Sequence, residues 1–259
     1  MTLFGGVDVG SAATKAVIID ERLEAVGRGL CHSGADFSAA AEEAFGQALE
    51  EAGVNRDQVT GVVSTGYGRT NVAFASERRT EIDCHARGAY HFFKHAITVV
   101  DIGGQDNKII EIDGGGKRVG FSMNRKCAAG TGSFLEEMAM RLKIPIGELS
   151  KLAERSTDHK VSIGSFCTVF AMTEILSKIR AGVKAEDLAR AALVSVAKRV
   201  LETRAVTSEV VATGGVVAHN PLMVEILSRI LSEPVHLPPF PQHVGAFGAA
   251  LNAAGLEEK

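Results

Sequence analysis

An aspartate followed seven residues later by a lysine occurs twice in this chain of 259 residues. The first copy is Asp8-Val-Gly-Ser-Ala-Ala-Thr-Lys15, and the second is Asp101-Ile-Gly-Gly-Gln-Asp-Asn-Lys108. In both copies an apolar run ends at the aspartate and another begins at the lysine, which is typical of two strands joined by a turn. Because the same unit recurs in the same context, we infer an internal duplication at the scale of a lobe rather than a short repeat.

Further apolar runs extend each copy to a three-stranded meander. We expect strands at 3–9, 15–20, 25–31, 61–65, 97–102, 108–112, 119–123, 210–213 and 235–237. Helical spacing of apolar residues predicts helices at 37–53, 132–142, 146–153, 169–181, 186–205, 220–231 and 245–254. This pattern predicts an α/β fold with duplicated β-meander lobes. The predicted N-terminal lobe is 1–95, completed by a C-terminal helix at 245–257, and the predicted C-terminal lobe is 96–244.

Composition excludes several classes of function. Hydrophobic residues make up 46% of the chain, which is enough for a substantial core. The net charge is −3 and no basic run occurs, so a nucleic-acid partner is not expected. No apolar stretch approaches the roughly 20 residues of a membrane span, and the N-terminus lacks the features of a signal peptide. Four cysteines without a regular pairing pattern indicate a reducing compartment, so we expect a cytoplasmic protein.

The two turns suit a polyphosphate, because small residues let backbone N–H groups approach phosphate oxygens. The candidate nucleotide-binding residues are Gly10, Ser11, Ala12, Ala13, Thr14, Lys15, Gly103, Gly104 and Gln105, with Gly214 and Gly215 in a third turn that would contact base and ribose. Asp8 and Asp101 are candidates for holding hydrated Mg²⁺ or orienting a water. Gln105 is the third candidate for positioning the water, and the one we favour. Aspartate and glycine are also common in plain hairpin turns, but two matched turns followed by a third favour a nucleotide site.

Two cysteines stand before predicted helices. Cys127 is the centre of Asn-Arg-Lys-Cys-Ala-Ala-Gly-Thr-Gly, and Cys167 lies in Gly-Ser-Phe-Cys-Thr-Val-Phe. On spacing alone, a pair of buried, unreactive thiols is the simpler interpretation. A zinc site is disfavoured, since no Cys-x-x-Cys motif or Cys/His cluster accompanies them.

These segments resemble known motifs. D-V-G-S-A-A-T-K, D-I-G-G-Q-D-N-K and T-G-G-V resemble the two phosphate motifs and the adenosine motif of the actin, sugar-kinase and DnaK-chaperone superfamily. That resemblance implies a two-lobed actin/sugar-kinase-like ATPase fold with ATP in the cleft. S-T-G-Y-G-R, C-H-A-R-G-A, K-C-A-A-G-T-G and C-T-V-F resemble one branch of it, the ATP-dependent activators of 2-hydroxyacyl-CoA dehydratases and the ATPase subunits of benzoyl-CoA reductases.

The resemblance runs from residue 6 to about 253 and implies an enzyme that hydrolyses MgATP while passing single low-potential electrons to a dehydratase or reductase. It implies one [4Fe–4S] cluster bridging two subunits through Cys127 and Cys167 of each. Such clusters take four cysteine thiolates, and helix N-termini favour the resulting anion. A homodimer, or a pair of homologous ATPase subunits, would complete the ligand set, and a ferredoxin- or flavodoxin-type carrier would supply electrons.

Two rival interpretations remain. A small-molecule kinase would use the same ATP lobes, but it would need a polar substrate pocket where the cysteine helices are expected. A non-enzymatic filament or chaperone module is the third possibility. The acyl-CoA, and the choice between dehydratase activator and reductase subunit, are left open by the sequence.

Overall fold

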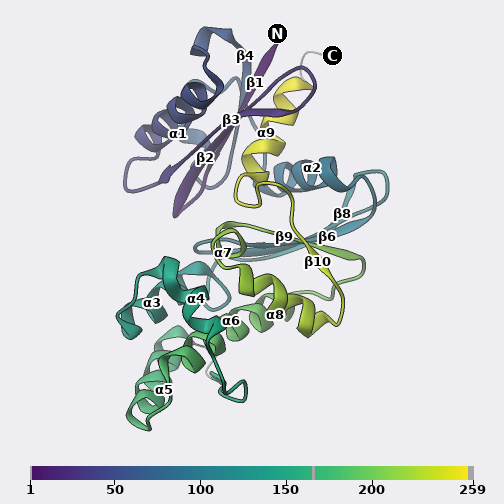
Figure 1. Ribbon diagram of the computed structural model, residues 1–259. Helices are drawn as coiled ribbons and strands as arrows, with labels where there is room; N and C mark the ends of the chain where they lie inside the picture. The colour runs from purple at the N-terminus through teal and green to yellow at the C-terminus, as the bar shows by residue number, and fades with distance from the viewer. Residues whose placement is uncertain (1, 165–166, 256–259) are drawn as a thin grey trace. The chain divides into compact units, whose positions relative to one another are not determined.

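The computed structural model describes residues 2–164 and 167–255, and these form two compact units (Figure 1). The first unit comprises 1–97, 111–120 and 238–259, and the second comprises 98–110 and 121–237. The described residues contain two five-stranded sheets, one built on each copy of the duplicated segment.

The first sheet has the strand order β3-β2-β1-β4-β5. Its strands are β1 (Leu3–Val9), β2 (Ala13–Ile19), β3 (Ala25–His32), β4 (Val59–Thr65) and β5 (Glu77–Arg78). β1 and β2 form an antiparallel hairpin in which Asp8 pairs with Lys15, while β1 and β4 run parallel with Asp8 beside Thr65. The register therefore places the motif's aspartate and lysine opposite each other at the end of the hairpin.

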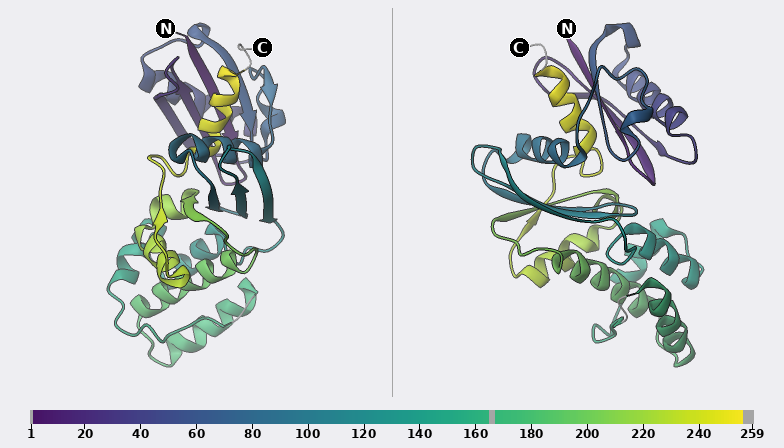
Figure 2. Two further views of the ribbon diagram at one scale, coloured as in Figure 1. Left: turned by 90° about the vertical axis from the view of Figure 1, so that its right-hand side faces the viewer. Right: turned by 180° about the vertical axis from the view of Figure 1, so that it is seen from behind.

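Helices cover both faces of this sheet. α1 (Phe37–Ala52) packs on one face through Phe45 and a row of alanines, and α9 (Val244–Ala254) packs on the other (Figure 2). Alternate residues of each strand point to opposite faces, so Val7 joins the α1 layer and Phe4 joins the α9 layer. At Gly6 a Cβ would lie 2.0 Å from the carbonyl oxygen of Ala246, so only glycine lets α9 approach the strand this closely.

α2 (Glu81–Phe93) packs beside α9 in the same layer. Thr80 is its N-cap and accepts a hydrogen bond from the backbone N–H of Asp83. The apolar spacing of the sequence predicted no helix here, although a threonine three residues before an acidic side chain is a helix-start signal. The helix was missed because its glycine and two histidines weaken the apolar periodicity.

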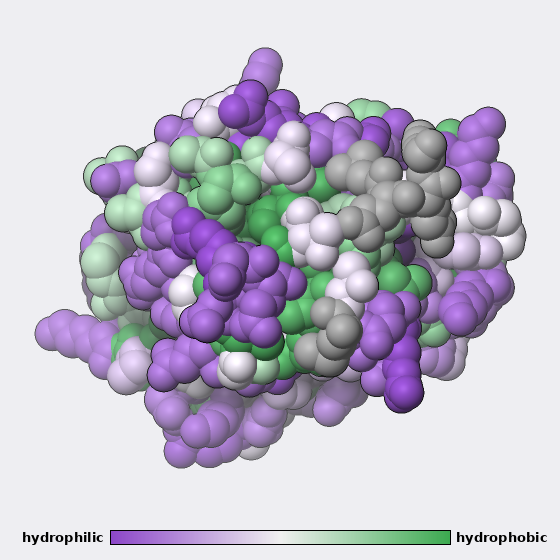
Figure 3. Space-filling view, turned by 90° about the horizontal axis from the view of Figure 1, so that it is seen from above, coloured by the Kyte–Doolittle hydropathy of each residue, from purple (hydrophilic) through white to green (hydrophobic). Residues whose placement is uncertain are grey.

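Figure 3 looks down on the end of the first unit where β1 begins and α9 ends. Apolar residues gather near the middle of this view, and hydrophilic residues surround them.

The second sheet has the strand order β10-β9-β6-β7-β8. Its strands are β6 (Ile97–Ile102), β7 (Asn107–Ile112), β8 (Arg118–Asn124), β9 (Glu209–Thr213) and β10 (Val235–His236). The helices of the second unit are α3 (Gly132–Leu142), α4 (Leu149–Glu154), α5 (Thr168–Arg180), α6 (Ala185–Leu201), α7 (Gly215–His219) and α8 (Pro221–Leu231). Short 3₁₀ turns occur at η1 (Arg56–Gln58), η2 (Arg69–Asn71) and η3 (Ile146–Glu148).

α6 is the central helix of the second unit's core. Ten of its residues are buried, among them Leu188, Leu193 and Val196, and they pack with α3, α4, α8 and the apolar face of the sheet. α5 differs, since only Ala171, Met172 and Ile175 of its residues are buried. The second unit therefore has a well-buried core and one helix with a largely exposed surface.

The predicted strands and most predicted helices are confirmed, with shifted ends. The helix predicted to reach residue 205 ends at Leu201, and the strand and glycine turn at 210–216 lead into the short helix α7. The α/β class with a duplicated strand meander is confirmed by the two sheets, whose consecutive strands β1–β3 and β6–β8 have the same order in each.

Candidate functional site

The first turn closes tightly around a buried carboxylate. Asp8 is 2% exposed, and Lys15 donates from Nζ to its Oδ2 at 3.2 Å. The backbone N–H of Gly10 donates to the carbonyl of Ala13 at 3.1 Å, which closes the loop between the strands. The other oxygen of Asp8, Oδ1, has no hydrogen-bond partner among the described residues. A buried carboxylate oxygen without a donor is costly, which makes Oδ1 the candidate atom of this turn for contact with a ligand.

Two glycines bring backbone close to Asp8. Gly66 has φ +88°, and a Cβ there would lie 2.4 Å from Asp8 Oδ1. A Cβ at Gly245 would lie 3.1 Å from Asp8 Oδ2 and 2.8 Å from His85 Nε2. His85 is 5% exposed, so the structure places it as a buried histidine beside the aspartate. Gly66, His85 and Gly245 were not among the site residues predicted from the sequence.

Two groups near Asp8, the Cys84 thiol and the His243 imidazole, have pKa values shifted in the direction that favours the neutral form. Burial, with a smaller contribution from the negative charge of Asp8, raises the pKa of the Cys84 thiol to about 12, although a hydrogen bond with Thr65 acts in the opposite direction. Burial and then the positive charges of Arg28 and Lys15 lower the pKa of His243 to about 4. At neutral pH the Cys84 thiol is therefore protonated and the His243 imidazole is neutral.

The second turn has the same spacing, but here the protein supplies a hydrogen-bond donor to each oxygen of the aspartate. Lys108, only 1% exposed, donates from Nζ to Asp101 Oδ2 at 2.9 Å and to Asp106 Oδ1 at 3.0 Å. Thr213 donates from Oγ1 to Asp101 Oδ1 at 2.8 Å. Both oxygens of Asp101 are thus occupied by the protein, whereas Gln105 is exposed at the turn.

The predicted third turn contacts the second one directly. Gly214 has φ +98°, and a Cβ there would lie 2.3 Å from the carbonyl oxygen of Ile102. The backbone of the Thr213-Gly214-Gly215 segment therefore passes against the end of β6, with Thr213 on Asp101. The hydroxyl of Thr213 was not predicted as a site residue, because its partner lies 112 residues away in the sequence.

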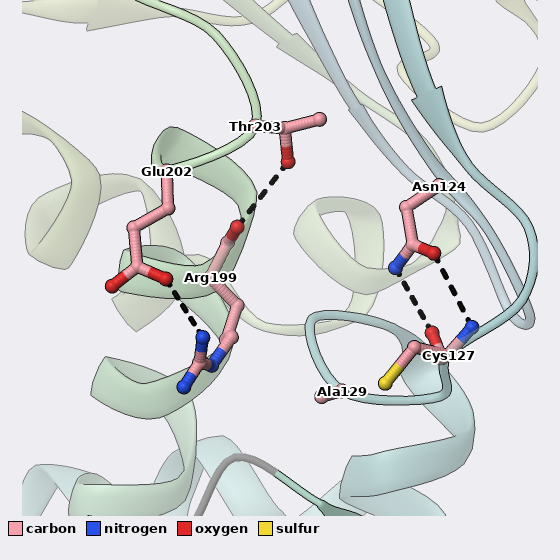
Figure 4. A pocket seen from close by; sticks show the side chains of 6 residues that line it. All are labelled: Asn124, Cys127, Ala129, Arg199, Glu202 and Thr203. Carbon is pink, nitrogen blue, oxygen red and sulfur yellow. Dashed lines mark hydrogen bonds and ion pairs between the residues drawn. The ribbon is translucent and has the colours of Figure 1, made fainter.

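Cys127 is exposed and lies in the loop between β8 and α3. Asn124 makes two hydrogen bonds with this residue and one with its neighbour: its Oδ1 accepts from the N–H groups of Cys127 and Lys126 at 3.2 Å each, and its Nδ2 donates to the Cys127 carbonyl at 3.0 Å. Figure 4 shows the two bonds between Asn124 and Cys127 and the thiol beside them. Asn124 thus fixes the backbone that carries the thiol, a role the sequence analysis did not assign.

A pocket of about 320 Å³ opens beside this thiol. It is lined by Asn124, Cys127, Ala129, Arg199, Glu202 and Thr203. Arg199 and Glu202 form an ion pair at 2.8 Å on the wall that faces the loop (Figure 4). The sulfur therefore faces open space.

Cys167 is also exposed, and it is the N-cap residue of α5. Its sulfur consequently lies near the positive end of a helix, which favours a thiolate or an anionic ligand. Cys127 is separated from α3 by the turn at 128–131, since that helix has Thr131 as its N-cap. Both thiols are free and exposed, which contradicts the interpretation as buried, unreactive cysteines.

The segment before Cys167 is held by acidic side chains. Glu174 of α5 accepts from the Gly164 N–H at 3.1 Å, and Asp187 of α6 accepts from Ser156 Oγ and from the N–H groups of Thr157 and Asp158. Within the described residues no group of three or more His, Cys, Asp or Glu side chains could hold a metal ion. The two exposed cysteines are soft sulfur donors of the type that iron–sulfur clusters require, and such clusters usually take four thiolates.

No helix in the described part of the chain is long and apolar enough to cross a membrane.

Comparison with known proteins identifies relatives over the full length of the chain. It is 40% identical over 257 residues to the activator of lactoyl-CoA dehydratase from Anaerotignum propionicum, covering 98% of each protein. It matches the crystal structure of component A of the Acidaminococcus fermentans (R)-2-hydroxyglutaryl-CoA dehydratase with a TM-score of 0.94 and 36% identity, covering 100% of both chains. It also matches the activator of the 2-hydroxyisocaproyl-CoA dehydratase from Clostridium difficile with bound ADPNP, with a TM-score of 0.92 and 36% identity, covering 99% of this chain and 96% of that one.

The family model of the BadF/BadG/BcrA/BcrD ATPases matches residues 6–253. This span includes both aspartate turns, the third glycine turn and both exposed cysteines. The chain therefore belongs to the BadF/BadG/BcrA/BcrD ATPase family.

Proposed function

We propose that this protein is an ATP-hydrolysing activator that passes single electrons to a 2-hydroxyacyl-CoA dehydratase. The observation that carries the proposal is the pair of exposed thiols, Cys127 and Cys167, in a chain that is 40% identical to a lactoyl-CoA dehydratase activator over nearly its whole length. Four free cysteines fit a reducing cytoplasm, where a ferredoxin- or flavodoxin-type protein would supply the electrons.

The nucleotide in this proposal is MgATP, as the ADPNP bound to a relative supports. The phosphate-binding segments in this proposal are the loop from Gly10 to Lys15 and the turn at Gly103 and Gly104, while Gly214 and Gly215 would contact base and ribose. Asp8 would hold the hydrated Mg²⁺, because its Oδ1 is buried and has no partner among the described residues. Asp101 would instead support the turn, since Lys108 and Thr213 occupy both of its oxygens.

Gln105 is the residue we propose for positioning the attacking water, because it is exposed at the turn next to Gly103 and Gly104. Gln105→Ala should leave ATP-analogue affinity within about threefold, since the backbone donors and Lys15 remain, while hydrolysis falls about 100-fold, which corresponds to about 2.7 kcal/mol of barrier. Calorimetric titration with ADPNP and a phosphate-release assay measure the two quantities. Turnover equal to that of the unsubstituted protein would remove this role from Gln105.

Cys127 and Cys167 would hold one [4Fe–4S] cluster together with the same residues of a second copy. The cluster supplies one-electron reduction when it is bound, and the thiolates of this chain bind it and orient it. The N-terminus of α5 would stabilise its negative charge at Cys167. Next to this cysteine Val169 and Phe170 are 71% and 68% exposed, and Leu176 is 50% exposed on the same helix. Large exposed apolar side chains beside a half-complete ligand set fit packing against a second copy.

The experiment that tests the function is iron and acid-labile sulfide analysis after anaerobic purification, with an electron paramagnetic resonance spectrum of the reduced protein. We expect about four irons per dimer and their loss in Cys127→Ser. Cys31→Ser is the matched control, because Cys31 is half-buried and donates from Sγ to the Ala40 carbonyl. A folded protein that hydrolyses ATP but holds no iron would overturn electron transfer and favour a kinase with the same ATP lobes.

A further inference from the structure

The cysteine loop, residues 125–131 between β8 and α3, and the first residues of α3 form hydrogen bonds with the second phosphate turn, residues 101–108. The N–H of Gly132 donates to the carbonyl of Gly103 at 2.9 Å, and the N–H of Ser133 donates to the carbonyl of Gly104 at 2.8 Å. The hydroxyl of Ser133 donates to the same Gly104 oxygen at 2.8 Å. The carbonyl groups of Gly103 and Gly104, the two glycines predicted to contact phosphate, therefore accept hydrogen bonds from the first residues of α3.

Asn107 makes the fourth connection, and it is the one in which the phosphate turn contributes a side chain. It is 1% exposed and donates from Nδ2 to the carbonyl of Gly130 at 2.9 Å. Its other amide atom, Oδ1, has no partner among the described residues. Leaving a buried amide oxygen without a hydrogen bond costs free energy. The interaction that this side chain contributes is therefore the bond from its Nδ2 to the Gly130 carbonyl.

The loop leaves little freedom between Gly130 and the thiol. Gly130 has φ +82°, and a Cβ there would lie 3.0 Å from both Asn107 Nδ2 and Arg199 Cβ. Thr131 donates from N–H and from Oγ1 to the Ala128 carbonyl at 3.1 and 2.6 Å, which closes the turn after Cys127. Because the turn is closed and packed, a displacement of Gly130 is passed to Cys127.

The turn on the other side is equally compact. The N–H of Gly103 donates to the carbonyl of Asp106 at 3.0 Å, and a Cβ at Gly103 would lie 2.6 Å from Asp106 Oδ1. Asn107 follows directly and begins β7. A phosphate that binds to or leaves Gly103 and Gly104 would therefore act on a compact turn. The residue that follows this turn, Asn107, holds the cysteine loop through its side chain.

We propose that Asn107 is the positioning residue that couples the nucleotide state of the second phosphate turn to the placement of Cys127. This inference rests on the proposed function for its consequence, since the loop carries a ligand of the proposed cluster. The coupling needs no contact with the other unit, because the turn, Asn107 and the loop all belong to the second unit. Loss of the amide donor removes the turn's connection to Gly130 within the loop, while the bonds of Gly132 and Ser133 keep the start of α3 on the turn.

The experiment compares Asn107→Ala with Ser133→Ala in the full chain, each with MgADP and with MgADPNP. Ser133→Ala is the matched control, because the Ser133 N–H keeps its bond to the same Gly104 oxygen. Hydrogen–deuterium exchange of peptides covering 101–107 and 127–135 reads the two segments separately. Release of iron to a chelator reads the cluster site, and calorimetry reads ADPNP affinity.

In the unsubstituted protein and in Ser133→Ala, we expect exchange in 127–135 and iron release to differ about fivefold or more between the two nucleotides. In Asn107→Ala the ratio for 127–135 should fall to about one, while 101–107 still responds and ADPNP affinity changes less than about threefold. Asn107→Asp retains the size of the side chain and removes the donor, so it should give the same loss and serves if the alanine variant does not fold.

A nucleotide-dependent difference in 127–135 that persists in Asn107→Ala or Asn107→Asp would overturn the coupling. So would a loop that does not respond to nucleotide in the unsubstituted protein. Absence of iron in the unsubstituted protein would contradict the proposed function instead, and the exchange measurement would still decide whether Asn107 couples turn and loop.

Discussion

The two aspartate turns have the same spacing but differ in how many oxygens of the aspartate have a partner in the protein. At the first turn Asp8 has one ionic contact, with Lys15 at 3.2 Å, and its second oxygen has no partner among the described residues. At the second turn Lys108 and Thr213 occupy both oxygens of Asp101. The strand-turn-strand geometry is therefore the same in both copies, while the surrounding fold leaves one oxygen of Asp8 without a partner among the described residues and supplies a donor to each oxygen of Asp101.

The largest expected effect is a difference in stability between variants of the two motif lysines, Lys108 and Lys15. Lys108→Met should lower the free energy of unfolding by about 3–5 kcal/mol, because it leaves the Asp101 and Asp106 carboxylates without their buried cation. Lys15→Met should cost clearly less, since the side chain of Lys15 is 16% exposed and its removal admits water to Asp8. Urea unfolding of both variants measures the difference, and equal losses would contradict it.

The next effect concerns ATP hydrolysis. Asp8→Asn should lower kcat about 100-fold, equivalent to about 2.7 kcal/mol, because a neutral amide holds Mg²⁺ poorly. It should lose less stability than Asp101→Asn, since Oδ1 has no partner to lose and the lysine at Oδ2, Lys15, is 16% exposed.

Asp101→Asn is the matched variant for that prediction. We expect it to act mainly on stability, because it removes the charge that Lys108 is buried against. Phosphate release measured under MgATP saturation, together with urea unfolding, tests both. A larger loss of kcat in folded Asp101→Asn than in Asp8→Asn would reverse the assignment of roles.

The smallest effect is a pH dependence confined to the first turn. Burial and the charges of Arg28 and Lys15 lower the pKa of His243 to about 4 in the folded protein, while the unfolded chain has the ordinary value near 6.5. Between these values the unfolded state binds more protons, so stability decreases as the pH falls. From pH 7 to pH 5.5 the contribution of His243 should be a loss of about 1 kcal/mol.

His243→Gln should remove that part of the pH dependence, while an otherwise matched His32→Gln variant at an exposed position should retain it. Urea unfolding at the two pH values measures the difference. An unchanged slope in His243→Gln would show that other groups cause the acid destabilisation.

Local patterns were sufficient for most of the fold. The apolar runs that end at Asp8 and Asp101 predicted both hairpins, and the confirmed register places Asp8 opposite Lys15. α2 was missed because Gly88 and the histidines obscure its apolar face, although Thr80 and Asp83 form a start signal. The close contact between β1 and α9 at Gly6 could not be predicted, since Gly6 and Ala246 are distant in sequence.

The sequence by itself determined the duplicated turns, the two cysteine segments and the resemblance to dehydratase activators, because each depends on residues within a few positions of one another. Only the tertiary structure decided which aspartate keeps an open oxygen, and that Asn107 reaches Gly130. Those outcomes depend on side chains brought together across 23 to 112 residues of chain. Hydrogen-bond satisfaction at a buried carboxylate or amide is a property of the packed site, so a local pattern does not contain it.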